Sequence, residues 1–122
     1  KFAGLFIDYG YYQNPKLREE NSYKCSLQAI KSHKFHNIFK DLGIADITSH
    51  IDFYPLEQIA TNQNFTSSTI TQRQFLHDFA IKLRLEHLKR QNPSKAIALD
   101  GQYNYLTADD KMGSLFKILQ IF

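Results

Sequence analysis

The polar and apolar positions of this chain predict strands alternating with helices. Residues 3–7 form a continuous apolar run that stops at Asp8 and Gly10, a pattern typical of a central strand covered on both faces. Residues 46–53 read Asp-Ile-Thr-Ser-His-Ile-Asp-Phe, which places isoleucines among hydrogen-bonding side chains. This stretch predicts an extended segment that delivers polar groups to one place.

Two helix starts carry capping signals. Asp52 precedes apolar residues at helical spacing, so we expect it to be the N-cap of a helix that ends near Asn62. Thr71 and Gln74 form a capping box, which predicts a long helix up to Asn92. We expect the apolar stripe of that helix to pack in the core; it consists of Phe75, Leu76, Phe79, Ala80, Leu83 and Leu88.

The rest of the pattern completes an α/β order. We expect a strand over residues 65–70, a shorter helix over 94–106 and a terminal strand over 115–122. Residues 11–23 predict a loop of the length that often covers a site, and residues 26–39 give no clear assignment. The alternation favours the α/β class without internal repeats.

Composition narrows the function classes. The 122 residues fit one small domain or part of a larger one, and the net charge of +3 comes from scattered Lys and Arg. We therefore expect no nucleic-acid partner, and no apolar run is long enough for a membrane span. Cys25 alone excludes an internal disulfide. Because Lys1 leads directly into a strand, we interpret the chain as a piece of a longer protein.

Candidate site residues follow the first strand and fill the central stretch. Asp8 and Tyr9 lie where the first strand ends, the edge at which α/β sheets gather functional groups; a simple turn is the alternative. For residues 46–53 the alternative is a well-capped strand-to-helix turn. His33 and His36 are three apart but lack a third ligand nearby, so we expect no metal. The glycines are too dispersed for a phosphate or nucleoside loop.

Several stretches together resemble one family. They occur in that family's order and cover nearly the whole chain: residues 4–10 (Gly-Leu-Phe-Ile-Asp-Tyr-Gly), 26–29 with His33, Gly43, 46–53, 71–72, 75–76, 106–108 and 112–117 (Met-Gly-Ser-Leu-Phe-Lys). The chain is similar to the C-terminal half of MidA-type methyltransferases, which depend on S-adenosylmethionine and whose mitochondrial members methylate a protein arginine as complex I assembly factors.

The chain departs from that family in two places. Lys24-Cys25 stands where the family has a glycine before its Ser/Thr-Leu pair, a change expected to alter a loop over the site. Phe79-Ala80-Ile81 stands where the family has Leu-Gly-Ile, and we expect Ala80 to cost close packing.

The resemblance implies that residues 1–122 are a single partial domain. It implies an α/β fold, the C-terminal part of the seven-stranded, Rossmann-like sheet of a class I methyltransferase. The N-terminal half, absent here, would bind S-adenosylmethionine, so we expect no cofactor-binding residue in this chain and no activity without that half. Partners would be a protein substrate, such as a respiratory complex I subunit, and the missing half. Localisation would be cytoplasmic in a bacterium and the mitochondrial matrix in a eukaryote.

Candidate roles follow from this resemblance. Asp8, His50 and Asp52 are the candidates for catalytic groups on the wall that faces the substrate. We assign substrate binding to Tyr9, Thr48 and His33. The alternative function is a non-catalytic fragment or docking module that works with a separate N-terminal chain.

Overall fold

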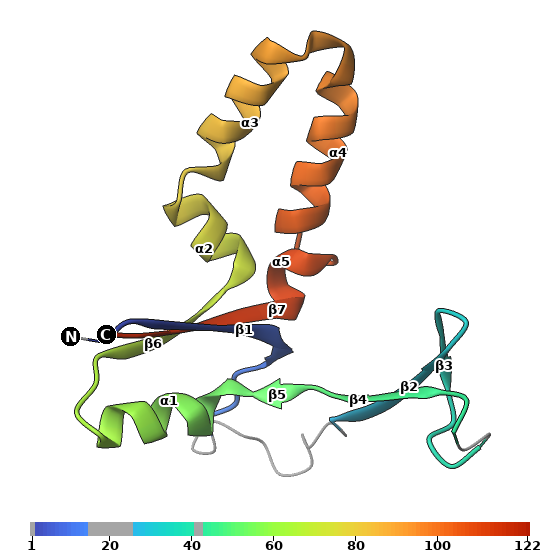
Figure 1. Cartoon of the computed structure of the whole chain (residues 1–122), viewed down its shortest axis with the longest axis vertical. Coiled ribbons are helices and arrows are strands. Elements are labelled where there is room, and N and C mark those ends of the chain that lie inside the picture. The colour runs from blue at the N-terminus through green and yellow to red at the C-terminus, as the bar shows by residue number, and fades with distance from the viewer. Residues whose placement is uncertain (1, 15–25, 41–42) are drawn as a thin grey trace.

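A computed structural model of the chain describes residues 2–14, 26–40 and 43–122. A four-stranded sheet lies between helices, and a smaller three-stranded sheet extends to one side (Figure 1). The strands of the larger sheet are β1 (Gly4–Tyr11), β5 (Ile51–Asp52), β6 (Ser67–Thr71) and β7 (Phe116–Ile121), in the order β5-β1-β7-β6. The predicted alternation of strands and helices is present.

Strand β7 is the centre of the larger sheet. It pairs antiparallel with β1 on one side and with β6 on the other, so β1 and β6 are parallel to each other. Ile118 and Leu119 of β7 are buried in the core. Strand β5 pairs with β1 in parallel at Gly10 and Tyr11. Among the described residues, no strand pairs with this edge of β1 over residues 4–9.

Helix α1 (Phe53–Asn62) covers one face of the sheet, where it packs against β6 and β7 (Figure 1). Its N-cap is Asp52, whose carboxylate accepts a hydrogen bond from the Tyr54 N–H at 3.1 Å, as the sequence predicted. Phe53 is the first residue of the helix and is fully buried. The cap thus fixes the direction in which the chain leaves β5.

The predicted long helix is wrong: it is two helices, α2 (Gln72–Asp78) and α3 (Ile81–Gln91). The capping box of Thr71 and Gln74 is confirmed. The helix breaks at Ala80, which has a left-handed φ of 56°. On the two sides of the break, Phe79 and Leu83 are 71% and 73% exposed, so the prediction that they pack in the core is wrong. Leu85 is the residue of α3 that is buried instead.

Helix α3 and helix α4 (Ala96–Thr107) form a hairpin that projects from the sheet, on the face opposite α1 (Figure 1). The 3-10 helix η2 (Pro93–Lys95) joins them, close to the predicted start at Ser94. Helix α5 (Met112–Leu115) then returns the chain to β7. A Cβ at Gly113 would lie 2.2 Å from the Thr107 carbonyl oxygen, so only glycine permits this close return.

The smaller sheet contains β2 (Leu27–Lys31), β3 (Lys34–His36) and β4 (Asp46–Ser49), in the order β3-β2-β4. Residues 26–39, which the sequence left unassigned, therefore form a hairpin. Its turn consists of Ser32 and His33, both at positive φ. The predicted loop at 11–23 and the expected effect of Cys25 fall mostly outside the described residues.

Candidate functional site

The candidate site lies at the carboxyl end of β1, where the backbone of β5 comes unusually close. A Cβ added to Gly10 would lie 2.1 Å from the Ile51 carbonyl oxygen, so a side chain at this position would force the strands apart. The pairing of Gly10 with Ile51 and of Tyr11 with Asp52 brings the central stretch to the end of the first strand. The sequence predicted both segments, but only the fold places them side by side.

Tyr9 and His50 meet at this end of the sheet. Their ring centroids are 5.4 Å apart, and the Tyr9 ring also contacts Phe116 edge-on at 5.7 Å. The backbone N–H of His50 donates to the Ser26 carbonyl oxygen at 2.9 Å, which holds the residue between the two sheets. A candidate substrate-binding residue and a candidate catalytic residue therefore form one aromatic contact, and aromatic faces of this kind bind cations.

The two candidate carboxylates already accept backbone hydrogen bonds. Asp52 caps α1 and also accepts from the Gln13 N–H at 3.3 Å. Asp8 accepts from the N–H of Tyr9 at 2.8 Å. Each carboxylate has two oxygens with several acceptor positions, so these bonds orient the groups without using up their capacity. Asp8 is half-buried and, as the strand neighbour of Tyr9, points to the opposite face of β1, whereas Asp52 has a clear structural role as the cap of α1.

Lys117 is a residue of this region that the sequence interpretation missed. It lies opposite Asp8 in the β1–β7 register, and its ammonium donates to the Gly10 carbonyl oxygen at 3.1 Å and to the Ser114 carbonyl oxygen. Burial lowers the pKa of Lys117 because the charged form loses solvation. The sequence did contain a signal for Lys117, because it is the one charged side chain in residues 115–122.

Tyr12 and Glu57 form a second contact that the sequence did not indicate. The Tyr12 hydroxyl donates to Glu57 Oε1 at 3.1 Å, and the Tyr12 ring packs edge-on against Tyr54 at 5.5 Å. Burial, together with the hydrogen bond to Glu57, raises the pKa of Tyr12. This pair links the segment after β1 to the first turns of α1, next to the Asp52 cap.

The other two candidates, Thr48 and His33, lie on the smaller sheet. Thr48 is in β4 opposite Gln28, and its hydroxyl is buried without a hydrogen-bond partner. His33 is exposed in the β2–β3 turn. The β1–β5 pairing and the contact of the Tyr9 and His50 rings group Tyr9, His50 and Asp52. Figure 1 shows the β2–β3 hairpin, whose turn contains His33, extending away from the larger sheet.

Two further findings concern the described part of the chain. Residues 2–14, 26–40 and 43–122 contain no group of three His, Cys, Asp or Glu side chains arranged to hold a metal ion. The helices described in these ranges are all too short or too polar to cross a membrane.

Comparison with solved structures defines the class of fold. Two crystal structures from Burkholderia thailandensis match 98% of this chain with TM-scores of 0.81 and 0.79, each at 22% identity. The chain covers 32% and 31% of them, and the second is bound to S-adenosyl-homocysteine. The fold is therefore part of the Rossmann-like α/β sheet of class I methyltransferases, as the sequence predicted.

The family follows from the sequence itself. A family model described as putative S-adenosyl-L-methionine-dependent methyltransferase matches residues 2–71, and the chain belongs to this family. Relatives named protein arginine methyltransferase NDUFAF7, mitochondrial, are 30% identical over 120 residues in Danio rerio and 28% identical over 121 residues in Homo sapiens. Each match covers 98% of this chain but 26% of the relative.

Proposed function

We propose that this chain is the C-terminal, substrate-facing portion of an S-adenosylmethionine-dependent methyltransferase that acts on a protein arginine. Residues 1–122 form one partial domain, and another part of the enzyme binds the cofactor. The chain spans about a quarter of the length of its relatives, 26%, which supports a partial domain. The mitochondrial relatives support a place in the mitochondrial matrix for a eukaryotic source, with a complex I subunit as substrate; a bacterial source implies the cytoplasm.

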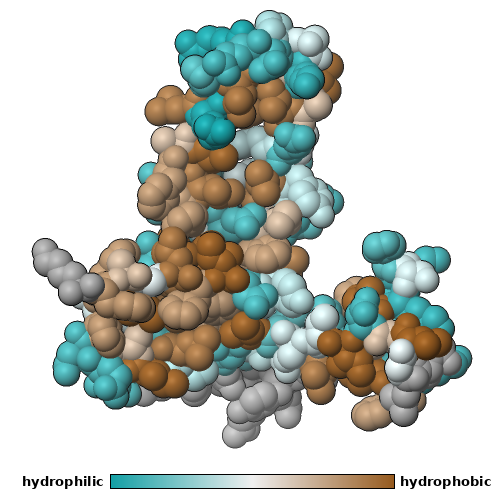
Figure 2. All heavy atoms as spheres, viewed as in Figure 1, coloured by the Kyte–Doolittle hydropathy of each residue, from teal (hydrophilic) through white to brown (hydrophobic). Residues whose placement is uncertain are grey.

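The observation that carries this proposal is the outer edge of β1 over residues 4–9, where none of the described strands pairs with it. Leu5, Phe6 and Ile7 are each about half exposed although they lie in the middle of a strand, and neighbouring side chains of a strand point to opposite faces. An edge strand that exposes apolar groups on both faces is a site for pairing with further sheet. Hydrophobic residues gather on the visible side of the larger sheet and, separately, on the smaller sheet (Figure 2).

The chemistry of the β1 end fits a wall for a guanidinium group. When bound, S-adenosylmethionine supplies an electrophilic methyl group, and transfer requires the accepting nitrogen to be held in line with it. A guanidinium is cationic and planar, so the Tyr9 and His50 rings offer faces for it. Asp8 lies on the opposite face of β1, where its carboxylate is a candidate for a cationic group that reaches around the strand end. Lys117 Nζ donates to the Gly10 and Ser114 carbonyl oxygens, so this side chain is directed at the backbone.

Isothermal titration tests where the cofactor binds. The chain alone is expected to give no heat with S-adenosylmethionine, whereas a chimera that places the preceding region of the Danio rerio relative before Lys1 is expected to bind it. Micromolar binding by the chain alone would contradict the proposed division of the enzyme.

Substitution of Asp8 tests its role in that chimera. Asp8→Asn is expected to lower the rate of arginine methylation at least tenfold and to leave cofactor affinity unchanged. Asp46→Asn, at the exposed start of β4, is the matched control and is expected to change neither. Full activity of the Asp8→Asn variant would contradict a role of Asp8 in methylation.

The second candidate function is a non-catalytic docking module that pairs with a separate chain through the same edge. The exposed apolar residues of β1 favour it equally. The two functions separate when the preceding region is supplied as a separate chain, because a docking module would associate with it without restoring arginine methylation.

A further inference from the structure

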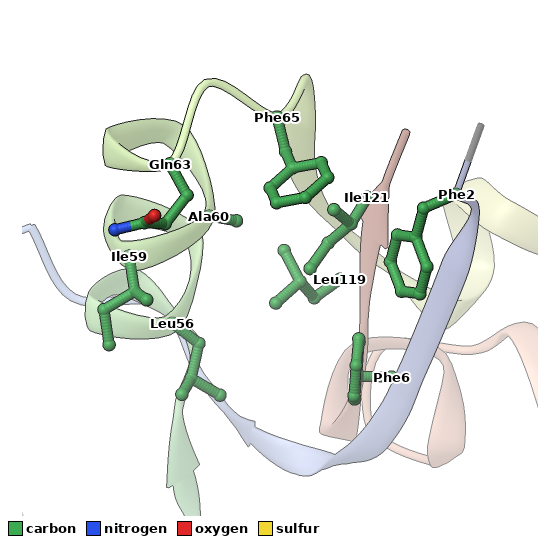
Figure 3. A pocket seen from close by; sticks show the side chains of 9 residues that line it. All are labelled: Phe2, Phe6, Leu56, Ile59, Ala60, Gln63, Phe65, Leu119 and Ile121. Atoms are coloured by element: carbon green, nitrogen blue, oxygen red, sulfur yellow. The ribbon is translucent and has the colours of Figure 1, made fainter.

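Exposed apolar residues gather in separate places on the described part of the chain. One group lines a hollow of about 340 Å³ between α1 and the sheet, where Phe6, Ile59 and Phe65 border a shared space (Figure 3). This hollow lies beside the outer edge of β1 and belongs to the surface described above. Another group projects with the hairpin of α3 and α4, on the opposite face of the sheet (Figure 1). The hairpin therefore offers a surface of its own.

The hairpin rises from the same edge of the sheet as the candidate site. Strand β6 ends at Thr71, which pairs with Lys117, and Lys117 pairs in turn with Asp8. The base of the hairpin is fixed there, because Gln72 Nε2 and Arg73 Nε donate to carbonyl oxygens at the end of α4 at 2.9 and 2.8 Å. With 11 residues, α3 extends about 16 Å from this base. A protein bound at the candidate site would therefore lie close to the hairpin.

The outer face of α3 combines apolar and cationic side chains. Leu83, His87 and Arg90 follow one another at spacings of four and three residues, which places them on one face of the helix. All three are exposed, Leu83 by 73%. Phe79, just before the break at Ala80, is 71% exposed. The face formed by Leu83, His87 and Arg90 is called the α3 face.

The hairpin also carries the net charge of the chain. Residues 79–107 contain five Lys and Arg and two acids, a net charge of +3 that equals the charge of all 122 residues. Figure 2 shows hydrophilic residues gathered at the free end of the hairpin. Both acids lie near one cation, because Lys89 Nζ is 2.9 Å from Asp100 and 3.8 Å from Glu86. No described carboxylate forms an ion pair with the other cations of the hairpin, which are Lys82, Arg84, Arg90 and Lys95.

We propose that the α3 face docks an acidic amphipathic segment of the protein substrate and so holds the substrate beside the candidate site. This inference rests on the proposed function, because it assigns substrate recognition to a surface of the proposed methyltransferase. Apolar side chains of the segment pack against Leu83 and Phe79, and its carboxylates pair with Arg90 and Lys82. Because these contacts are remote from the reacting arginine, they lower KM and leave kcat unchanged.

The make-up of α3 favours a protein partner over a membrane or RNA. Ile81, Leu85 and Leu88 line the cleft toward α4, so the outer face keeps too few large apolar side chains to insert into a bilayer. Surfaces that bind single-stranded RNA place aromatic rings among the cations for base stacking, and α3 contains no Phe, Tyr or Trp. A short apolar stripe flanked by cations instead matches a helical segment with the opposite charge.

Designed peptides test this chemistry on the chain itself. One probe is a fluorescent helical peptide with leucines on one stripe and glutamates beside it, and the other replaces every glutamate with lysine. The chain is expected to bind the glutamate peptide at least tenfold more tightly, with an affinity that falls as salt rises. Equal affinity for the two peptides would overturn the proposal. Binding to phosphatidylserine vesicles without binding to the glutamate peptide would assign the surface to a membrane and overturn it as well.

Two variants test whether the peptide binds at the α3 face. Arg90→Glu is expected to weaken binding of the glutamate peptide at least fivefold and to strengthen binding of the lysine peptide, a reversal that loss of folding does not produce. Leu83→Ser is expected to weaken binding of the glutamate peptide at least fivefold. The matched controls are Lys34→Glu, exposed in β3, and Ile97→Ser, 90% exposed in α4, each expected to change affinity less than twofold. Equal losses in variants and controls would overturn docking at the α3 face.

Methylation by the chimera separates this inference from the proposed function. Its substrate is a peptide with one arginine, joined by a glycine–serine linker to the glutamate segment or to the lysine segment. The glutamate segment is expected to lower KM at least tenfold at unchanged kcat, and Arg90→Glu is expected to abolish the difference. Methylation with one KM for both peptides would overturn the docking and leave the proposed function standing. The expected reversal in peptide binding, in a chimera that methylates neither peptide, would contradict the proposed function and leave a docking surface for acidic segments.

Discussion

Strand β7 is buried at its centre, whereas its partner β1 is half exposed at its outer edge, although the two strands are similarly apolar in sequence. Ile7 and Ile118 are direct partners in the β1–β7 register, so their side chains lie next to each other on one face. Ile118 is 1% exposed and Ile7 is 54% exposed. The core therefore stops between two identical side chains. Apolar character alone identifies a strand that can be buried, and the neighbouring elements decide whether it is.

Gly10→Val is expected to have the largest effect on stability, because Gly10 lies where β5 pairs with β1. A Cβ there would meet the Ile51 carbonyl oxygen, so β5 must separate from β1 and the Asp52 cap would shift with it. We expect a loss of about 4 kcal/mol in the free energy of unfolding, measured by urea denaturation.

The control for that variant is Gly101→Ala in α4, where an added Cβ meets nothing within 4 Å. Alanine is the better helix former there, so the free energy of unfolding is expected to rise by about 0.5–1 kcal/mol. A Gly10→Val variant as stable as the unsubstituted chain would contradict the close approach of β5 to Gly10.

Matched truncations compare the two isoleucines directly. Ile118→Ala is expected to cost about 3 kcal/mol, because it opens a cavity in a closed core. Ile7→Ala in the chain alone removes a half-exposed side chain and is expected to cost about 1 kcal/mol or less. Equal losses in urea denaturation would mean that β1 is as well covered as β7.

Ala80→Gly tests the break between α2 and α3 on the closed side. Ala80 is exposed and has a left-handed φ of 56°, so the expected loss of close packing is wrong and the cost lies in the backbone. Glycine adopts this conformation without that cost, and we expect a gain of about 1 kcal/mol in stability. Ala98→Gly, exposed within α4, should instead lose about 1 kcal/mol; the same sign for both variants would contradict the strain at Ala80.

Asp109→Asn is expected to have the smallest effect, and one that depends on pH. Hydrogen bonds from Ser114 and Arg73 lower the pKa of Asp109 below its usual 3.8, and Arg73 also donates to the Thr107 carbonyl oxygen at 2.8 Å. Because the pKa is lowered in the folded state, the stabilisation is complete above the unfolded value and is lost as the pH falls through the folded value.

The measurement is the melting temperature between pH 6 and pH 2. Wild type should exceed Asp109→Asn by a small, constant amount above about pH 5, and the difference should vanish at the acid end. Asp110→Asn, whose carboxylate contacts Lys111 at 3.5 Å on the surface, is the control. A difference that grows toward low pH would have the wrong sign.

Local signals in the sequence predicted where helices begin, but not every position at which the backbone turns. The caps at Asp52 and Thr71 were correct because each depends on a side chain and a backbone N–H only two or three residues away. The break at Ala80 and the Ser32-His33 turn were missed because neither has the glycine or asparagine that marks positive φ.

The positions of the candidate residues depend on pairing between distant segments. Tyr9, His50 and Asp52 lie at one end of the sheet because β5 pairs with the end of β1. Lys117 was missed because its partners are carbonyl oxygens of Gly10 and Ser114, which no side-chain pattern reveals. The roles of all these residues, and of Thr48 and His33, stay predictions.

Hydrogen–deuterium exchange over β1 is the most direct test of its unpaired edge. In the chain alone, amides of residues 4–9 are expected to exchange faster than those of β7, which pairs on both sides. Association with the preceding region of the Danio rerio relative should slow exchange in β1 and leave β6 and β7 unchanged. Exchange in β1 that is already as slow as in β7, or that stays the same in the complex, would contradict a docking edge.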